Sequence, residues 1–197
     1  MKKILILALA AVAAFQLNAQ NIVKGSIEGV PAQGSYHPTY SSDGADYRPM
    51  NVILMIGDGT GLAQIAAGYF ANNEELTYAN LKYMGWVTTK SADAFTTDSA
   101  ASGTAYSSGY KTYNGAVGVD VKKRPQPNIP ERVIKSGIIS GVVSTDDLNG
   151  ATPAAFFAHQ PQRGMTDEIW ADPPSSVLKY FASGSKEVFE ARPLETQ

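Results

Sequence analysis

Two apolar runs, each followed by a polar turn and a helix-like segment, most constrain what this chain can fold into. The first run, residues 51–56, stops at a glycine-containing turn, 57–61, and apolar residues then recur at the spacing of one helix face up to Phe70. The second run, 138–143, leads through a polar turn into 151–159. Uninterrupted apolar runs of this length are typical of strands buried in a parallel sheet. The alternation predicts an α/β protein, a three-layer sandwich with a largely parallel sheet.

Shorter patterns predict the remaining elements. These are a strand at 86–89, a turn at Asn114-Gly115, and helices at 99–108, 130–136, 174–181 and 186–189. Gly109 and Gly137 are expected to end two of these helices, because glycine readily adopts the left-handed conformation found there. In the helix at 151–159, Thr152 is the expected cap and Pro153 the expected first helical residue.

The amino terminus has the pattern of a bacterial secretory signal peptide. Lys2-Lys3 precede an apolar run, and a cut after Ala19 suits the small residues there. We therefore expect residues 1–19 to be removed on export to the periplasm or the exterior. Residues 20–49, rich in Gly, Ser, Pro and Tyr, are expected to form an extended arm before a folded domain at 50–197.

Composition excludes several partners and sites. Hydrophobic residues make up 44% of the chain and charged residues 17%, so the chain can bury a core. The net charge of −2 and the lack of a basic stripe speak against a nucleic-acid partner. Because the chain has no cysteine, it has no disulfide, no thiolate metal ligand and no lipid anchor on an N-terminal cysteine. We expect no membrane anchor, and any metal ligands would be oxygen or histidine.

Ser99 is the candidate nucleophile. Asp98 is a good N-cap residue, which puts Ser99 at the first helical position, where free N–H groups and the positive helix end can hold an anion. A serine there suits attack on a phosphate, whose transition state needs fixed positive potential. Ala101 and Ala105 are small enough to let this helix lie close on a sheet. The plain alternative is that Asp98-Ser99 only caps a helix.

Three other residues are expected to join Ser99 at one edge of the sheet. Asp58 follows the first apolar run, at the carboxyl end of a predicted strand, where ligands usually bind in open α/β sheets. Its carboxylate suits a hard or borderline cation, and the Thr152 hydroxyl lies on a neighbouring turn. Arg163 offers a planar fork that can hold two phosphate oxygens. Each also has an ordinary alternative, as a turn residue, a helix cap and a surface charge.

Four segments, in this order, closely resemble the bacterial alkaline phosphatases. They are Val52–Gly61, Thr97–Ala105, Gly109–Asp120 and Ala151–Phe156, followed by Arg163. The likeness runs from about Asn51 to Arg163, with a looser continuation at 181–185. It implies an enzyme that hydrolyses phosphate monoesters with two zinc ions and one magnesium ion, through a phosphoserine intermediate.

The resemblance also implies a role for each candidate residue. Ser99 matches the nucleophile of the family, and Arg163 matches its phosphate-binding guanidinium. Asp58 matches the carboxylate shared between one zinc and the magnesium, and Thr152 matches the magnesium-ligating hydroxyl. Asp98 matches the residue that helps to position the arginine.

Neither histidine is expected to bind metal. His159 falls at a family position that is not a ligand, so we expect it to pack or to form hydrogen bonds, and His37 is expected to be an exposed polar residue. Many family members have aspartate or histidine two residues before the magnesium-ligating hydroxyl, where this chain has Gly150. Replacement by a nearby oxygen ligand is open, and the candidates are Asp146, Asp147 and Asn149.

In the family, the other zinc and magnesium ligands come from the second half of the protein. The sequence is therefore expected to be the amino-terminal portion of a longer enzyme, and the alternative is an inactive truncated fragment that lacks the later zinc ligands. The resemblance also suggests a homodimer, in which the arm before Pro49 could take part.

Overall fold

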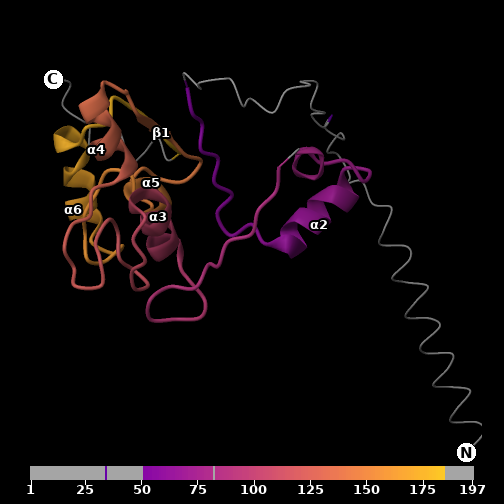
Figure 1. Cartoon of the computed structure of the whole chain (residues 1–197), viewed down its shortest axis with the longest axis horizontal. Coiled ribbons are helices and arrows are strands. Elements are labelled where there is room, and N and C mark those ends of the chain that lie inside the picture. Colours follow the sequence, from indigo (N-terminus) through magenta and orange to yellow (C-terminus); the bar gives the residue numbers. More distant parts are fainter. Residues whose placement is uncertain (1–33, 35–50, 82, 185–197) are drawn as a thin grey trace, which may run out of the picture. The chain divides into compact units, whose positions relative to one another are not determined.

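The computed structural model describes residue 34, residues 51–81 and residues 83–184 (Figure 1). The predicted signal peptide (1–19), His37, the helix at 186–189 and all of the predicted arm except Gly34 lie outside the described residues. The chain divides into two compact units, Met1–Trp86 and Val87–Gln197. Among the described helices, none has the length and apolar character needed to cross a membrane.

The first unit contains the helix α2 (Leu62–Ala71) and the 3-10 helix η1 (Thr77–Asn80) (Figure 1). Gly61 caps α2, and its N–H donates to Gln64 Oε1 at 3.1 Å. The predicted helix is therefore confirmed, but its predicted buried face is not, because α2 has no buried residue.

The predicted strand at 51–56 is wrong for the described residues. Residues 51–57 are extended without strand pairing, and the side chains of Val52, Ile53 and Met55 are each more than four-fifths exposed. The strand predicted at 86–89 is also not formed, and Trp86 is exposed. A strand exists only when it pairs with another, and in the described part of the chain these two segments have no strand partner.

The second unit has a core of small and large apolar side chains. Its helices are α3 (Ser99–Ser108), α4 (Ile129–Val133), η2 (Ile134–Ser136), α5 (Ala151–Ala154), α6 (Thr166–Ala171) and η3 (Pro173–Ser175). Figure 1 shows the four labelled α-helices of this unit gathered together with β1. Leu148 and Ile169 are fully buried at the centre, and Trp170 and Leu178 pack in the same cluster.

A parallel pair of strands confirms the predicted α/β class. β1 (Gly141–Val143) pairs with β2 (Tyr180–Ala182), with Val142 opposite Phe181. These two residues pack on the core, and the ring of Phe181 meets that of Phe157 edge to face at 5.8 Å. Val143 points to the other side of the strand and is 84% exposed, as the two-residue period of a strand requires.

The helix predicted at 174–181 is wrong. The chain forms only η3 there and then enters β2. Two adjacent prolines, Pro173 and Pro174, limit helical hydrogen bonding, because proline has no N–H to donate. The following residues bond instead to the other strand segment, beginning with Lys179 N to Ser140 O at 2.9 Å. Tertiary pairing therefore determines this segment.

The helix ends follow the predicted pattern closely. Gly109 and Gly137 both adopt the left-handed conformation, with φ of 79° and 76°, directly after α3 and η2. The helix predicted at 130–136 is α4 followed by η2. Gly115 has φ of 93° in the predicted Asn114-Gly115 turn. Glycine avoids the steric cost that other residues meet at positive φ.

α3 packs on another helix through its small residues. A Cβ added at Gly103 would lie 3.2 Å from Ala155 Cβ and 3.5 Å from Thr152 Cα, so any larger residue would crowd the contact between α3 and the α5 segment. Ala101 and Ala105 line a pocket of about 190 Å³ together with residues 87–91, and the predicted close approach of this face to a sheet stays a prediction. α5 is also shorter than predicted, and its cap is Gly150 instead of Thr152.

We expect Gly103→Val to lower the free energy of unfolding of the second unit by about 1–3 kcal/mol, because the added methyl groups overpack the contact between α3 and α5. Urea unfolding can be followed by the fluorescence of Trp170, which is buried in this unit. Gly164→Val is the matched control, because nothing lies within 4 Å of a Cβ at that position. Equal stability of the two variants would contradict the close packing.

The Asp120 carboxylate is expected to make the stability of the second unit depend on pH. The pKa of its buried carboxyl is held below the ordinary value by the side-chain hydrogen bond from Arg124, and then by the backbone N–H groups of Arg124 and Lys122. The stabilisation is therefore complete above the unfolded pKa of about 3.9, and is lost as the pH falls through the folded pKa. We expect the native chain to be more stable than Asp120→Asn at pH 7, with the difference shrinking below about pH 4. Urea unfolding at several pH values measures this, and a difference independent of pH would contradict it.

Candidate functional site

Ser99 lies where the sequence predicts it, at the first position of α3. Asp98 is the N-cap, and its Oδ1 accepts a hydrogen bond from Ala101 N at 2.9 Å. The backbone oxygen of Asp98 accepts a further bond from Ser102 Oγ, also at 2.9 Å. The Ser99 side chain is half-buried at the start of this ten-residue helix. It therefore lies at the positive end of the helix dipole.

The second oxygen of the Asp98 carboxylate connects this helix start to Arg163. Oδ2 accepts a hydrogen bond from Gly115 N at 2.9 Å and lies 3.5 Å from Arg163 Nη1. The Arg163 side chain is 45% exposed, and that of Asp98 is 25% exposed. An ion pair this open contributes little stability, but it orients the guanidinium while part of the group faces solvent. The positioning of Arg163 by Asp98 stays a prediction.

Asp93 and Asn114 support Asp98, and sequence reasoning missed both residues. Asn114 Oδ1 accepts from Asp98 N at 3.1 Å, and Asn114 N donates to Asp93 Oδ1 at 2.9 Å. This N–H bond and one from the Ser91 hydroxyl lower the pKa of Asp93. The polar turn Asn114-Gly115 was visible in the sequence, but its contact with a turn about twenty residues earlier had no sequence pattern.

Two segments, 113–118 and 159–163, run side by side and hold Arg163 in place. Val117 and Gln160 form an antiparallel bridge through N–O distances of 2.9 and 2.8 Å. Arg163 N donates to Gly115 O at 2.7 Å, and the Tyr113 hydroxyl donates to Pro161 O at 2.8 Å. The backbone of Arg163 is therefore fixed by the same turn that binds Asp98. We call 113–118 and 159–163 the paired segments.

Thr152 is half-buried on α5, and its backbone packs beside Gly103 of α3. The space that a side chain at Gly150 would occupy is filled by the Asp146 carboxylate, whose Oδ2 a Cβ at 150 would overlap. Of the three oxygen ligands considered in place of residue 150, Asp146 is therefore the one whose carboxylate lies beside Gly150.

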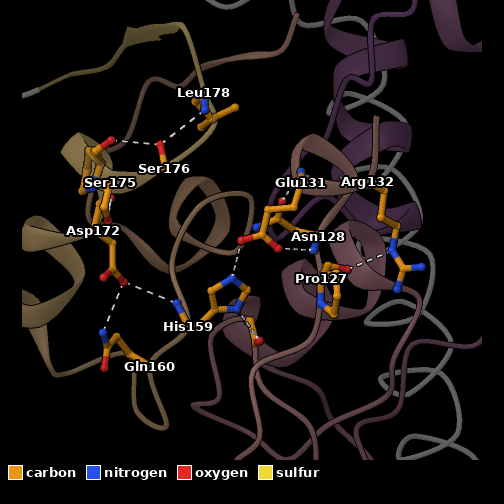
Figure 2. Close-up of polar contacts among 12 residues, drawn as sticks. Pro127, Asn128, Glu131, Arg132, His159, Gln160, Asp172, Ser175, Ser176 and Leu178 are labelled. Atoms are coloured by element: carbon orange, nitrogen blue, oxygen red, sulfur yellow. Dashed lines mark hydrogen bonds and ion pairs between the residues drawn. The ribbon is translucent and has the colours of Figure 1, made fainter. Parts of the chain in front are cut away.

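His159 forms two hydrogen bonds, as the sequence analysis expects. Its Nδ1 lies 2.7 Å from Gly118 O, and its Nε2 lies 2.8 Å from Glu131 Oε1 (Figure 2). Both ring nitrogens are therefore engaged with the protein.

Asp58 lies in the first unit, in an exposed turn where Thr60 N donates to Gly57 O at 3.2 Å. The other four candidates, Asp98, Ser99, Thr152 and Arg163, belong to the second unit. The predicted convergence of Asp58 with Ser99 at one sheet edge thus stays a prediction. Within the second unit, the structure brings Ser99, Asp98 and Arg163 together.

The described residues do not make a metal centre by themselves. No group of three or more His, Cys, Asp or Glu side chains among them could hold an ion. Zinc is bound by histidine, cysteine and carboxylate ligands, and the one histidine of the described residues, His159, is already bonded to Gly118 and Glu131. Oxygen donors such as Thr152 and Asp146 suit magnesium chemically, but they are too few to complete its shell.

A family model for alkaline phosphatase matches residues 49–187. The chain is 40% identical over 130 residues to the alkaline phosphatase of Escherichia coli K12. This alignment covers 60% of the chain and 27% of the relative. It is 41% identical over 148 residues to alkaline phosphatase H of Pseudomonas aeruginosa. This alignment covers 68% of the chain and 31% of the relative. The chain thus spans less than a third of these relatives.

Solved structures agree with the family match. The alkaline phosphatase of the Antarctic bacterium TAB5 superposes with a TM-score of 0.65 at 38% identity, over 69% of this chain and 40% of that one. The cold-active alkaline phosphatase of a Shewanella species superposes with a TM-score of 0.63 at 35% identity, over 68% of this chain and 36% of that one. Two TAB5 variants, His to Asp and His to Glu at one position, were solved with magnesium in a site called M3. The predicted alkaline-phosphatase-like α/β fold is confirmed, and the chain belongs to the alkaline phosphatase family.

Proposed function

We propose that the protein that contains this chain is an alkaline phosphatase that hydrolyses phosphate monoesters through a phosphoserine on Ser99. One observation carries the proposal: a single carboxylate, Asp98, caps the helix that begins with Ser99 and also contacts Arg163. A nucleophile position and a phosphate-binding cation are thereby connected through one residue. Family membership supports the reaction class.

The residues of the second unit suit the two displacement steps. Ser99 Oγ attacks phosphorus and gives up its proton, an Oγ–P bond forms, the ester O–P bond breaks, and the departing alkoxide takes up a proton to leave as the alcohol. Water then attacks the phosphoserine, inorganic phosphate leaves, and the Ser99 hydroxyl is restored. Arg163 holds two phosphoryl oxygens, and the N-terminal amides of α3 offset the negative charge that both steps carry.

Two zinc ions and one magnesium ion belong to the proposal as family cofactors. Asp58 is proposed as the carboxylate between one zinc and the magnesium, and Thr152 as the magnesium-ligating hydroxyl. Asp146 is proposed to replace the side chain missing at Gly150, because its carboxylate fills that space. The remaining zinc and magnesium ligands are proposed from family likeness, which assigns them to the second half of the protein. Bound metal would supply Lewis acidity at the phosphoryl group.

The proposal extends to the whole protein. Residues 1–19 are proposed as a signal peptide, 20–49 as an extended arm, and 50–197 as the amino-terminal part of the catalytic domain, exported to the periplasm or beyond. A homodimer is proposed from family likeness. The alternative is an inactive truncated fragment of such an enzyme; the chain covers 27% of its Escherichia coli relative.

Ser99→Ala in the full-length protein is expected to lower kcat by at least about a thousandfold, because it removes the atom that forms the phosphoenzyme. The assay is hydrolysis of a generic phosphomonoester at alkaline pH with zinc and magnesium. Ser102→Ala is the matched control, since it removes a hydroxyl that bonds to the Asp98 backbone, and it is expected to keep most of the activity. An active Ser99→Ala variant would refute the assignment.

The 197-residue chain alone is expected to show almost no turnover in the same assay. Robust metal-dependent hydrolysis by it would mean that its own residues complete the metal site.

Arg163→Ala is expected to weaken the inhibition constant of inorganic phosphate about 10- to 100-fold, because a charged hydrogen-bonding group contributes roughly 1.5–3 kcal/mol. Arg163→Lys should recover part of this loss, since lysine keeps the charge but lacks the planar fork. Competitive inhibition of the full-length enzyme measures both. An unchanged constant in Arg163→Ala would contradict the proposed role.

A further inference from the structure

His159 connects two parts of the second unit through its ring. Its side chain is 22% exposed, and the partner Glu131 is 32% exposed, so both groups are largely removed from water. One ring nitrogen therefore contacts a backbone carbonyl, Gly118 O, and the other contacts the Glu131 carboxylate. Figure 2 shows the His159 ring directed toward Glu131.

Glu131 is itself held in a fixed position. Its other carboxylate oxygen, Oε2, accepts from Asn128 N at 2.9 Å, and Asn128 Oδ1 accepts from Glu131 N at 3.0 Å. These reciprocal bonds form the capping box of α4, and Asn128 is fully buried (Figure 2). The carboxylate that meets His159 is therefore anchored to a helix start.

Gly118 allows the ring to approach. Its φ of +63° is a conformation that suits glycine, and a Cβ there would overlap Ala158 O and come within 2.8 Å of His159 Nδ1. Gly118 N also donates to Thr104 Oγ1 of α3 at 2.8 Å. Gly118 thus bonds to the His159 ring through its carbonyl and to α3 through its N–H. The ring is connected in this way to the helix that begins with Ser99.

The paired segments run from this point directly to Arg163. His159 is followed by Gln160, which bridges Val117, and then by Arg163, whose N–H donates to Gly115 O. Asp172 adds a weaker support, with its Oδ2 3.2 Å from Gln160 Nε2 and 3.4 Å from His159 N (Figure 2). Through Glu131, the His159 ring joins the paired segments to α4.

We propose that the His159–Glu131 pair is a positioning element for Arg163: by fixing the paired segments, it holds the guanidinium beside Asp98 for phosphate binding. This inference rests on the proposed phosphate-binding role of Arg163. His159 does not touch the phosphate in this account. Its effect is transmitted through four residues of backbone that pair with 115–118.

The direct test is amide hydrogen exchange, followed by NMR on the whole chain. His159→Ala is expected to accelerate exchange at the amides of Gln160 and Arg163 about tenfold, because local opening of the paired segments becomes easier. The amides of Ser102 and Gly109, which bond within α3, serve as internal references and should change far less. A uniform acceleration at all four amides would show general destabilisation and would overturn the proposal.

Glu131→Gln provides a second variant that keeps the size of the side chain and removes its charge. It is expected to give the same selective pattern with a smaller acceleration. Glu168→Gln, the same change at an exposed residue of α6, is the matched control and should leave all four rates unchanged. If neither His159→Ala nor Glu131→Gln changes the exchange rates of the Gln160 and Arg163 amides, the proposal is overturned.

Inorganic phosphate, used as an inhibitor of the full-length enzyme, separates this inference from the proposed function. We expect Glu131→Gln to weaken the inhibition constant about three- to tenfold with kcat nearly unchanged, which is a smaller loss than in Arg163→Ala. If Arg163→Ala weakens phosphate and Glu131→Gln does not, the positioning role is wrong and the proposed function stands. If Arg163→Ala has no effect, the phosphate role of Arg163 fails, and with it the inference.

Discussion

The arrangement of the second unit depends on the Asp98 carboxylate. One oxygen caps α3 through Ala101 N, and the other accepts from Gly115 N beside Arg163. Three parts of the chain that are far apart in sequence therefore meet at one side chain. Because α3 presents its N-terminal amides next to this point, negative charge on a ligand would be favoured where Ser99 begins the helix.

Close backbone approach makes this arrangement possible. Gly103 lets α3 pack on the α5 segment, and Gly118 lets the His159 ring reach the backbone of the paired segments. Apolar packing in the core around Leu148 and Ile169 stabilises the helices and segments that make these contacts. The candidate site is thus built largely from small residues and backbone hydrogen bonds.

Local patterns predicted the caps and turns well, because their causes lie within a few residues: Asp98 caps α3, and Gly109 ends it. Local patterns failed in segments whose structure depends on whether they pair with another strand. Residues 51–56 have the composition of a buried strand yet remain unpaired in the described chain, whereas 174–181 were predicted helical, and the strand that begins at Tyr180 pairs with β1. In the site, Ser99, Asp98 and Arg163 were predicted, but Asp93 and Glu131 were not, since each acts through a partner distant in sequence.

The central claim is that Ser99 becomes phosphorylated during turnover, and the most direct test is to trap that intermediate. Full-length enzyme is mixed with a phosphomonoester and quenched in acid, and the peptide that contains residues 91–111 is sequenced by mass spectrometry. We predict one added phosphoryl group, located on Ser99. A phosphoryl group on Thr97 or Ser102, or none on this peptide while substrate is being consumed, would contradict the account.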